Sequence, residues 1–294
     1  MKNSLITVAA LLLTAIPAFA QDPHAEHQAA QPPSSVSQDW AKQRVDKSPR
    51  HHEWVNLKYG NRVVNAFVVY PEVKSKAPAV VVIHEIFGMS DWVQLLADEV
   101  AEAGSIAIAP DLLSGMGPNG GGTSTFADGT AIGKAIRDLP PDQITADLNA
   151  AADYVAKLPA ANGKVAVAGF CWGGTQSFRF ATNRPTLSAA YVFYGTGPET
   201  AEAIEAIKAP VYGFYAGNDA RVGATVPKTE EMMKAAKKAF EPVTYAGAGH
   251  GFMRAGETPP PPADAAQAAK DAFAGNKKAR DEAWTRWKAL LRKL

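Results

Sequence analysis

The chain contains one cysteine, Cys171, which lies in the sequence Gly-Phe-Cys-Trp-Gly-Gly over 169–174. An apolar run over 164–169 precedes it and a helix-forming segment follows, so the pattern predicts a strand, a sharp turn and a helix. Such a turn brings backbone segments together and favours glycine at 169 and 173. A thiol at this helix N-terminus is expected to have a lowered pKa and to act as a nucleophile towards an acyl carbon.

A nucleophilic thiol needs a base, and the base needs a group that orients it. Asp219 follows the apolar run 211–216, and His250 follows the run 242–245 in the sequence Gly-Ala-Gly-His-Gly-Phe. Taken singly, Asp219 is also an ordinary turn former, and a histidine between glycines is an ordinary loop residue. Their joint occurrence after successive predicted strands, in the order nucleophile, acid, histidine, predicts a catalytic site formed with Cys171.

A further carboxylate, Glu85, directly follows another apolar run and is expected at the same edge of the sheet. If partly buried, it would have a raised pKa and could accept a proton. As an alternative, it could form a salt bridge with Arg254 or Arg221, and the residues alone favour neither role. The backbone N–H groups of Trp172 and Ile86 are the expected donors to an oxyanion.

The elements that must position these residues alternate between short apolar runs and segments of helical periodicity, which predicts an α/β fold with a mostly parallel sheet. Ligands bind beyond the carboxyl ends of such strands, where the candidate residues lie. We expect strands over 55–57, 63–70, 79–84, 105–109, 164–169, 189–193, 211–216 and 242–245, the first two as an antiparallel hairpin. We expect helices over 91–103, 141–157, 172–181, 199–207, 227–240 and 277–294.

Five segments together resemble the dienelactone hydrolases, a family of α/β-hydrolases with a cysteine nucleophile. They are His-Glu-Ile-Phe-Gly over 84–88, Ala-Pro-Asp-Leu over 109–112, the cysteine segment, Gly-Asn-Asp over 217–219 and Gly-His-Gly-Phe over 249–252. The resemblance implies a twisted sheet of about eight strands with helices on both faces. It also implies hydrolysis of an activated ester or lactone through a Cys-His-Asp triad and a thioacyl-enzyme.

By the same resemblance, Glu85 adjoins the thiol and helps to deprotonate it when substrate arrives. Arg254 matches a basic residue that meets a carboxylate of the substrate. Phe87 and Phe252 belong to the matching motifs and are expected to line the substrate site.

The chain departs from the family between 110 and 141, where a second arginine for the substrate carboxylate has no counterpart. Arg137 is the nearest candidate, although a solvated helix charge is the more ordinary interpretation. The glycine-rich segment there predicts a mobile rim or lid. A broader exported carboxylesterase or thioesterase remains open, as does a ligand-binding or thiol-redox protein without hydrolytic activity.

The composition narrows the choice of partners. The chain has 30 Lys and Arg against 29 Asp and Glu and no long basic block, so neither nucleic acid nor an anionic membrane surface is expected. No metal, nucleotide or flavin motif is present, and therefore no cofactor is implied. We expect a monomer acting on a small molecule.

The first residues have the pattern of a secretory signal peptide: Lys2, an apolar run over 5–16 and Ala-Phe-Ala over 18–20. Cleavage near Ala20 would export the protein to the periplasm or out of the cell, and in an oxidising compartment a lone cysteine must be a free thiol. The segment 21–50 is poor in large apolar residues and is expected to be a flexible leader. The remainder, 51–294, is expected to form a single α/β-hydrolase domain.

Overall fold

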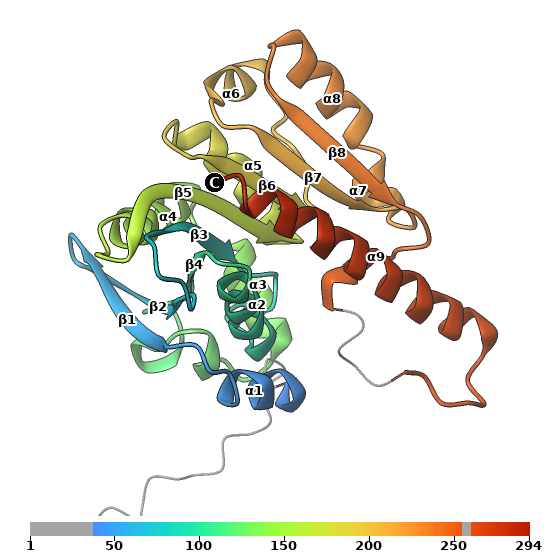
Figure 1. The fold of residues 1–294 in the computed structure, drawn as a ribbon, viewed down its shortest axis with the longest axis horizontal. Helices are drawn as coiled ribbons and strands as arrows, with labels where there is room; N and C mark the ends of the chain where they lie inside the picture. Colours follow the sequence, from blue (N-terminus) through green and yellow to red (C-terminus); the bar gives the residue numbers. More distant parts are fainter. Residues whose placement is uncertain (1–37, 255–259) are drawn as a thin grey trace, which may run out of the picture. The chain divides into compact units, whose positions relative to one another are not determined.

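The computed structural model describes residues 38–254 and 260–294, through which an eight-stranded sheet runs in the order β1-β2-β4-β3-β5-β6-β7-β8 (Figure 1). β1 and β2 form an antiparallel hairpin, β2 pairs antiparallel with β4, and the other pairs are parallel. This confirms the predicted α/β class and the eight predicted strands. Their bounds are β1 (His52–Tyr59), β2 (Arg62–Val69), β3 (Ala77–Ile83), β4 (Ile106–Pro110), β5 (Ala161–Phe170), β6 (Ala189–Phe193), β7 (Val211–Ala216) and β8 (Phe240–Tyr245).

Helices cover both faces of the sheet, because the parallel strands are apolar on both sides. Along β3, Val81 lies in the core beneath one layer of helices, whereas Val80 and Val82 lie in the core beneath the other. The first layer contains α3 (Gly129–Arg137), α4 (Pro141–Ala156), α5 (Trp172–Asn183), α6 (Ala201–Ala206) and α8 (Val226–Ala235). The second contains α1 (Asp39–Asp46), α2 (Asp91–Glu102) and α9 (Gln267–Leu291), while the short α7 (Ala220–Gly223) follows β7.

The last helix, α9, covers the strands next to the cysteine. The ring of Trp287 is fully buried and packs against Phe193 of β6 at 4.9 Å between ring centroids. It also contacts Phe170 of β5 at 5.9 Å, and Phe170 directly precedes Cys171. The core under α9 is therefore aromatic at the point where β5 ends.

Several helical segments differ from the prediction: α7 is not among the expected helices, and α8 ends at Ala235 rather than at 240. Helix α1 lies inside the segment expected to be a flexible leader, and its buried Ala41 and Val45 pack against the core that contains α2. Helix α3 lies in the segment expected to be a mobile rim, and α9 begins ten residues earlier than expected. The signal peptide and the leader up to 37 lie outside the described residues. Among the described helices, none has both the length and the apolar character needed to cross a membrane.

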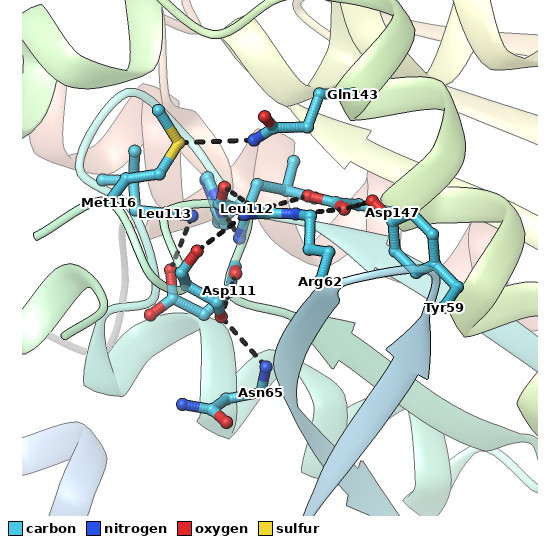
Figure 2. Close-up of polar contacts among 11 residues, drawn as sticks. Tyr59, Arg62, Asn65, Asp111, Leu112, Leu113, Met116, Gln143 and Asp147 are labelled. Atoms are coloured by element: carbon cyan, nitrogen blue, oxygen red, sulfur yellow. Dashed lines mark hydrogen bonds and ion pairs between the residues drawn. The ribbon is translucent and has the colours of Figure 1, made fainter. Parts of the chain in front are cut away.

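An ion pair between the half-buried Arg62 and the buried Asp147 joins the β1–β2 hairpin to α4 (Figure 2). Arg62 donates to both carboxylate oxygens of Asp147, from Nε and Nη2 at 2.7 Å each, and the Tyr59 hydroxyl donates to the same carboxylate. The guanidinium also donates to the carbonyls of Leu112 and Ser114 at 3.2 and 2.9 Å. Arg62 thereby fixes the start of the loop that follows β4.

The same loop is also held by a side-chain network at its other end. It contains two short 3-10 helices, η1 (Pro118–Gly120) and η2 (Thr123–Thr125). Asp111 accepts from the N–H and the hydroxyl of Thr123 at 2.8 and 2.7 Å, and that hydroxyl accepts from the N–H of Met89 at 3.1 Å. The segment expected to be a free rim is therefore hydrogen-bonded to the loop after β3.

Candidate active site

Cys171 lies at the turn between β5 and α5 with φ 56° and ψ −118°, in the left-handed φ region that side chains other than glycine rarely adopt. Close backbone packing maintains this turn. A Cβ on Gly169 would lie 1.9 Å from the carbonyl oxygen of Gly173, and a Cβ on Gly173 would lie 2.3 Å from that of His84. The geometry confirms the predicted strand, turn and helix and explains both glycines.

The structure brings His250 and Asp219 to the cysteine. Nε2 of His250 lies 3.0 Å from Sγ of Cys171, and its Nδ1 lies 2.5 Å from Oδ2 of Asp219. The other oxygen of Asp219 accepts the N–H of Val222 at 3.2 Å and caps α7, so the carboxylate is held from two sides. The three residues expected at successive strand ends therefore lie within hydrogen-bonding reach, as a nucleophile, its base and the orienting group require.

Glu85 is buried beside this group and faces Arg254. Its Oε2 lies 3.0 Å from Nε of Arg254, while Oε1 is buried and has no hydrogen-bond partner among the described residues. Burial raises the pKa of Glu85 to about 7, against the opposing effects of the Arg254 charge and the nearby Tyr194 hydroxyl. The carboxyl therefore has the raised pKa expected from burial, and its ion pair is with Arg254 rather than with Arg221.

The pKa of the Cys171 thiol is raised, and the expectation that it would be lowered is wrong. Burial is the main cause, and the neighbouring Glu85 carboxylate is the second. The N–H of Trp172 at the start of α5 and the charges of Arg254 and Arg221 oppose the increase but do not overcome it. Burial and the Glu85 carboxylate together therefore favour the neutral form of the thiol.

Of the two backbone positions expected to bind an oxyanion, Trp172 directly follows the cysteine and its N–H faces the thiol. Trp172 is the first residue of α5, so its N–H has no acceptor within the helix, and Ile86 belongs to the loop after β3. His84 steadies this region: one ring nitrogen lies 2.9 Å from the carbonyl of Glu85, and the other accepts the N–H of Leu112 at 3.3 Å. Burial lowers the pKa of His84, so the ring is neutral and structural.

The two phenylalanines expected to line the substrate site have different environments. Phe87 is 37% exposed, and the guanidinium carbon of Arg254 lies 5.2 Å from its ring centroid. Phe252 is fully buried in η3 (Phe252–Arg254) and packs against Tyr194 and Tyr245 at 5.3 and 5.4 Å. The structure therefore corrects the expected role of Phe252, since its ring supports the site from beneath and offers no surface to a substrate.

Tyr194 is a site residue that the sequence analysis missed. It directly follows β6, has φ 40°, and its buried ring packs on that of His250 at 5.0 Å between centroids. The rule that ligands bind beyond strand ends could have found it.

Arg137, left open as a substrate contact, is exposed at the end of α3 and lies back over Gly133 of the same helix.

A strained strand-to-helix turn that carries the cysteine, with a histidine and an acid after later strands of a mostly parallel sheet, is typical of the α/β-hydrolase fold. The family model for the dienelactone hydrolase family matches residues 64–294. The chain belongs to the dienelactone hydrolase family.

Known relatives agree with this assignment. The chain is 32% identical over 191 residues to a protein of Escherichia coli strain K12, and the match covers 60% of this chain and 67% of the relative. It is 28% identical over 210 residues to a protein of Methylorubrum extorquens, and that match covers 67% of this chain and 71% of the relative. Both relatives bear the name "Putative carboxymethylenebutenolidase". The fold is similar to a "Putative Dienelactone Hydrolase" structure from Klebsiella pneumoniae, with a TM-score of 0.68 and 24% identity over 83% of this chain and 99% of the other.

Proposed function

We propose that this protein hydrolyses an activated ester or lactone through a thioacyl intermediate on Cys171. The observation that supports this best is the continuous arrangement of Sγ, the imidazole of His250 and the carboxylate of Asp219, with contacts of 3.0 and 2.5 Å. Thiols attack carbonyl carbons with good leaving groups readily, which favours activated esters and lactones over amides.

In the proposed reaction, the sulfur attacks the carbonyl carbon while the thiol proton passes to Nε2 of His250. The carbonyl electrons move onto oxygen, which accepts hydrogen bonds from the N–H groups of Trp172 and Ile86. When the carbon–oxygen bond breaks, the leaving alkoxide takes the proton from the imidazolium and a thioester remains on Cys171. Water then attacks the thioester and gives a proton to His250, the carbon–sulfur bond breaks, and the sulfur recovers that proton.

Asp219 has an electrostatic and an orienting role in this scheme. It accepts the proton on Nδ1 of His250, which leaves Nε2 free to face the thiol and stabilises the imidazolium when it forms. Because the resting thiol is neutral, removal of its proton coincides with attack on the substrate.

Glu85 supplies a second proton acceptor beside the thiol. Its partner Arg254 has a side chain that is 35% exposed, whereas that of Glu85 is only 3% exposed. A carboxylate on the substrate can therefore reach Arg254 and compete with Glu85 for the guanidinium. Loss of that contact raises the pKa of Glu85 further, which makes the ionised carboxylate a stronger base towards the thiol proton.

The same residues indicate the substrate class. We assign the carboxylate of the substrate to Arg254 and an adjoining apolar or unsaturated part to the exposed ring of Phe87. A single arginine at this position suits an ester or lactone with one carboxylate.

Hydrolysis of p-nitrophenyl acetate tests the proposal. We expect Cys171→Ser and His250→Ala each to lower kcat by at least about a thousandfold, while Lys277→Gln on the exposed side of α9 keeps the wild-type rate. Mass spectrometry of wild-type protein quenched shortly after mixing with the ester should find an acetyl group on Cys171. If all the proteins release nitrophenol at the same background rate, the hydrolase proposal fails and a binding or thiol-redox role takes its place.

A second screen separates a strict lactonase from a broad esterase. Wild-type protein is compared on a series of aryl esters and lactones, each with and without a carboxylate. We expect the carboxylate to raise kcat/KM in the wild type and to lose this effect in Arg254→Gln.

We also propose that residues 1–20 form a signal peptide and that the mature protein acts in the periplasm or outside the cell. The apolar run and the Ala-Phe-Ala segment support this. Expression of the full chain in a two-membrane bacterium, followed by fractionation and sequencing of the mature N-terminus, should find a periplasmic protein that starts near Gln21. An uncleaved cytoplasmic product would contradict the proposal.

A further inference from the structure

In the loop that carries His250, the peptide group between Ala248 and Gly249 is fixed at both of its polar atoms. The carbonyl of Ala248 accepts the N–H of Asn218 at 2.8 Å, and the N–H of Gly249 donates to Oδ1 of Asn276 at 2.7 Å. Asn218 precedes Asp219 in the chain, so the first contact ties the loop of the histidine to the loop of the acid. The second ties the loop of the histidine to α9.

Helix α9 approaches this loop unusually closely. A Cβ on Gly275 would lie 2.5 Å from the carbonyl oxygen of Gly247, so glycine at 275 is what allows Asn276 to reach the loop. Gly247 itself has φ +76°, which places the turn of the loop against the helix. Glycine residues in both the helix and the loop therefore allow the close contact.

The next turn of α9 holds the segment that follows. Nε of Arg280 donates to the carbonyl of Met253 at 3.2 Å, and Met253 directly precedes Arg254. Asn276 and Arg280 are four residues apart and lie on one side of the helix. One rigid element therefore contacts the backbone beside His250 and the backbone beside Arg254.

We propose that Asn276 is a positioning residue that sets the distance between His250 and the thiol by fixing the 248–249 peptide. The expected effect on catalysis rests on the proposed function, whereas the positioning of His250 relative to the thiol does not depend on it. Without the Oδ1 acceptor, the Gly249 N–H turns towards solvent and the peptide loses one of its two fixed points. Misplacement of a catalytic group by about 1 Å can cost about a hundredfold in rate.

The test compares three variants on α9. Asn276→Leu removes the acceptor at similar volume, Asn276→Asp retains an acceptor in the same place, and Lys277→Gln changes the exposed neighbour of Asn276. With p-nitrophenyl acetate we expect Asn276→Leu to lose about 10- to 100-fold in kcat with KM within about twofold of wild type. Asn276→Asp should recover most of the lost rate, and Lys277→Gln should match wild type.

A second measurement does not depend on hydrolysis. The rate at which iodoacetamide alkylates Cys171 is followed against pH, in wild type and in His250→Ala. The imidazole accepts the thiol proton in the wild type, so His250→Ala should need a higher pH to react. We expect the profile of Asn276→Leu to move towards that of His250→Ala, and that of Lys277→Gln to stay with wild type.

The two measurements separate the inference from the proposed function. If no protein hydrolyses the ester but the alkylation profile of Asn276→Leu still moves, the proposed function fails and the positioning role stands. A wild-type kcat and alkylation profile in Asn276→Leu would overturn the inference, as would an equal loss of rate in Asn276→Asp. If Asn276→Leu does not fold, Gly275→Ala disturbs the same contact and is expected to act in the same direction.

Discussion

Replacement of Glu85 by glutamine tests the buried carboxyl at the centre of the site. The pKa of this group is about 7 in the folded chain, against 4.5 for an exposed carboxyl, so the folded chain binds the proton more tightly than the unfolded chain does. The stabilising effect of that proton is therefore complete below pH 4.5 and is lost as the pH rises through 7. Glutamine cannot titrate, so the variant lacks this pH dependence.

The size of the effect follows from the two pKa values. Their separation corresponds to about 3 kcal/mol of unfolding free energy, of which about 2.5 kcal/mol falls between pH 5 and pH 8. For a chain of this length, this corresponds to about 5–10 °C in Tm. We therefore expect the Tm of Glu85→Gln minus that of wild type to rise by about 5–10 °C between pH 5 and pH 8. The contact with Arg254 strengthens as Glu85 ionises, but the pKa of about 7 already includes the effect of the arginine charge, so the contact adds nothing further to this trend.

Thermal unfolding followed by tryptophan fluorescence at half-unit steps of pH measures the difference. Glu205→Gln on the exposed side of α6 is the matched control, for which we expect a difference from wild type that stays within about 1 °C across the same range. A Tm difference for Glu85→Gln that is flat between pH 5 and pH 8 would show that burial does not raise the pKa of Glu85. The proposed proton-accepting role would then lose its basis.

Three further predictions concern other parts of the molecule. Gly169→Ala should destabilise the fold by about 3 kcal/mol or more, because its Cβ would lie 1.9 Å from a backbone carbonyl oxygen of α5; urea unfolding that leaves the midpoint unchanged would contradict this. Arg254→Gln should move the acidic limb of the kcat/KM profile to higher pH, since the arginine charge lowers the pKa of Glu85, and an unmoved limb in the pH–rate profile would count against the pairing. Asp147→Asn should lower the free energy of unfolding by about 3–5 kcal/mol, because it leaves the half-buried Arg62 without its carboxylate. We expect kcat per folded molecule to stay unchanged, and a stable variant with reduced kcat would indicate a role in catalysis instead.

The strands were predictable from sequence because strands buried on both faces produce continuous apolar runs. The helices were predictable only where they cover the core along their length. The first half of α9 is polar and exposed, so its helical state follows from the packing of its second half, around Trp287, rather than from its own pattern. Helix α1 has a mostly polar sequence, so its place in the fold is evident from its contacts in the structure, such as the burial of Ala41 and Val45, rather than from its own pattern.

The site was predictable where local rules apply and not where distant residues decide the chemistry. Chain order and strand ends place Cys171, Asp219 and His250 together. The raised pKa of the thiol depends on how deeply it is buried and on Glu85, which lies far away in sequence, and the helix N-terminus alone suggested the opposite direction. The contact from Asn276 depends on where α9 docks, and no local pattern predicts it.

The packing of α9 has a consequence for how the protein is made. Trp287 closes the aromatic surface formed by Phe170 and Phe193, yet it lies 117 residues after Phe170 and 94 residues after Phe193 in the sequence. During synthesis, the ribosome therefore releases β5 and β6 well before the element that covers them exists. We expect the growing chain to remain unfinished and prone to association until the last helix docks, which is when the histidine loop also gains its final contact.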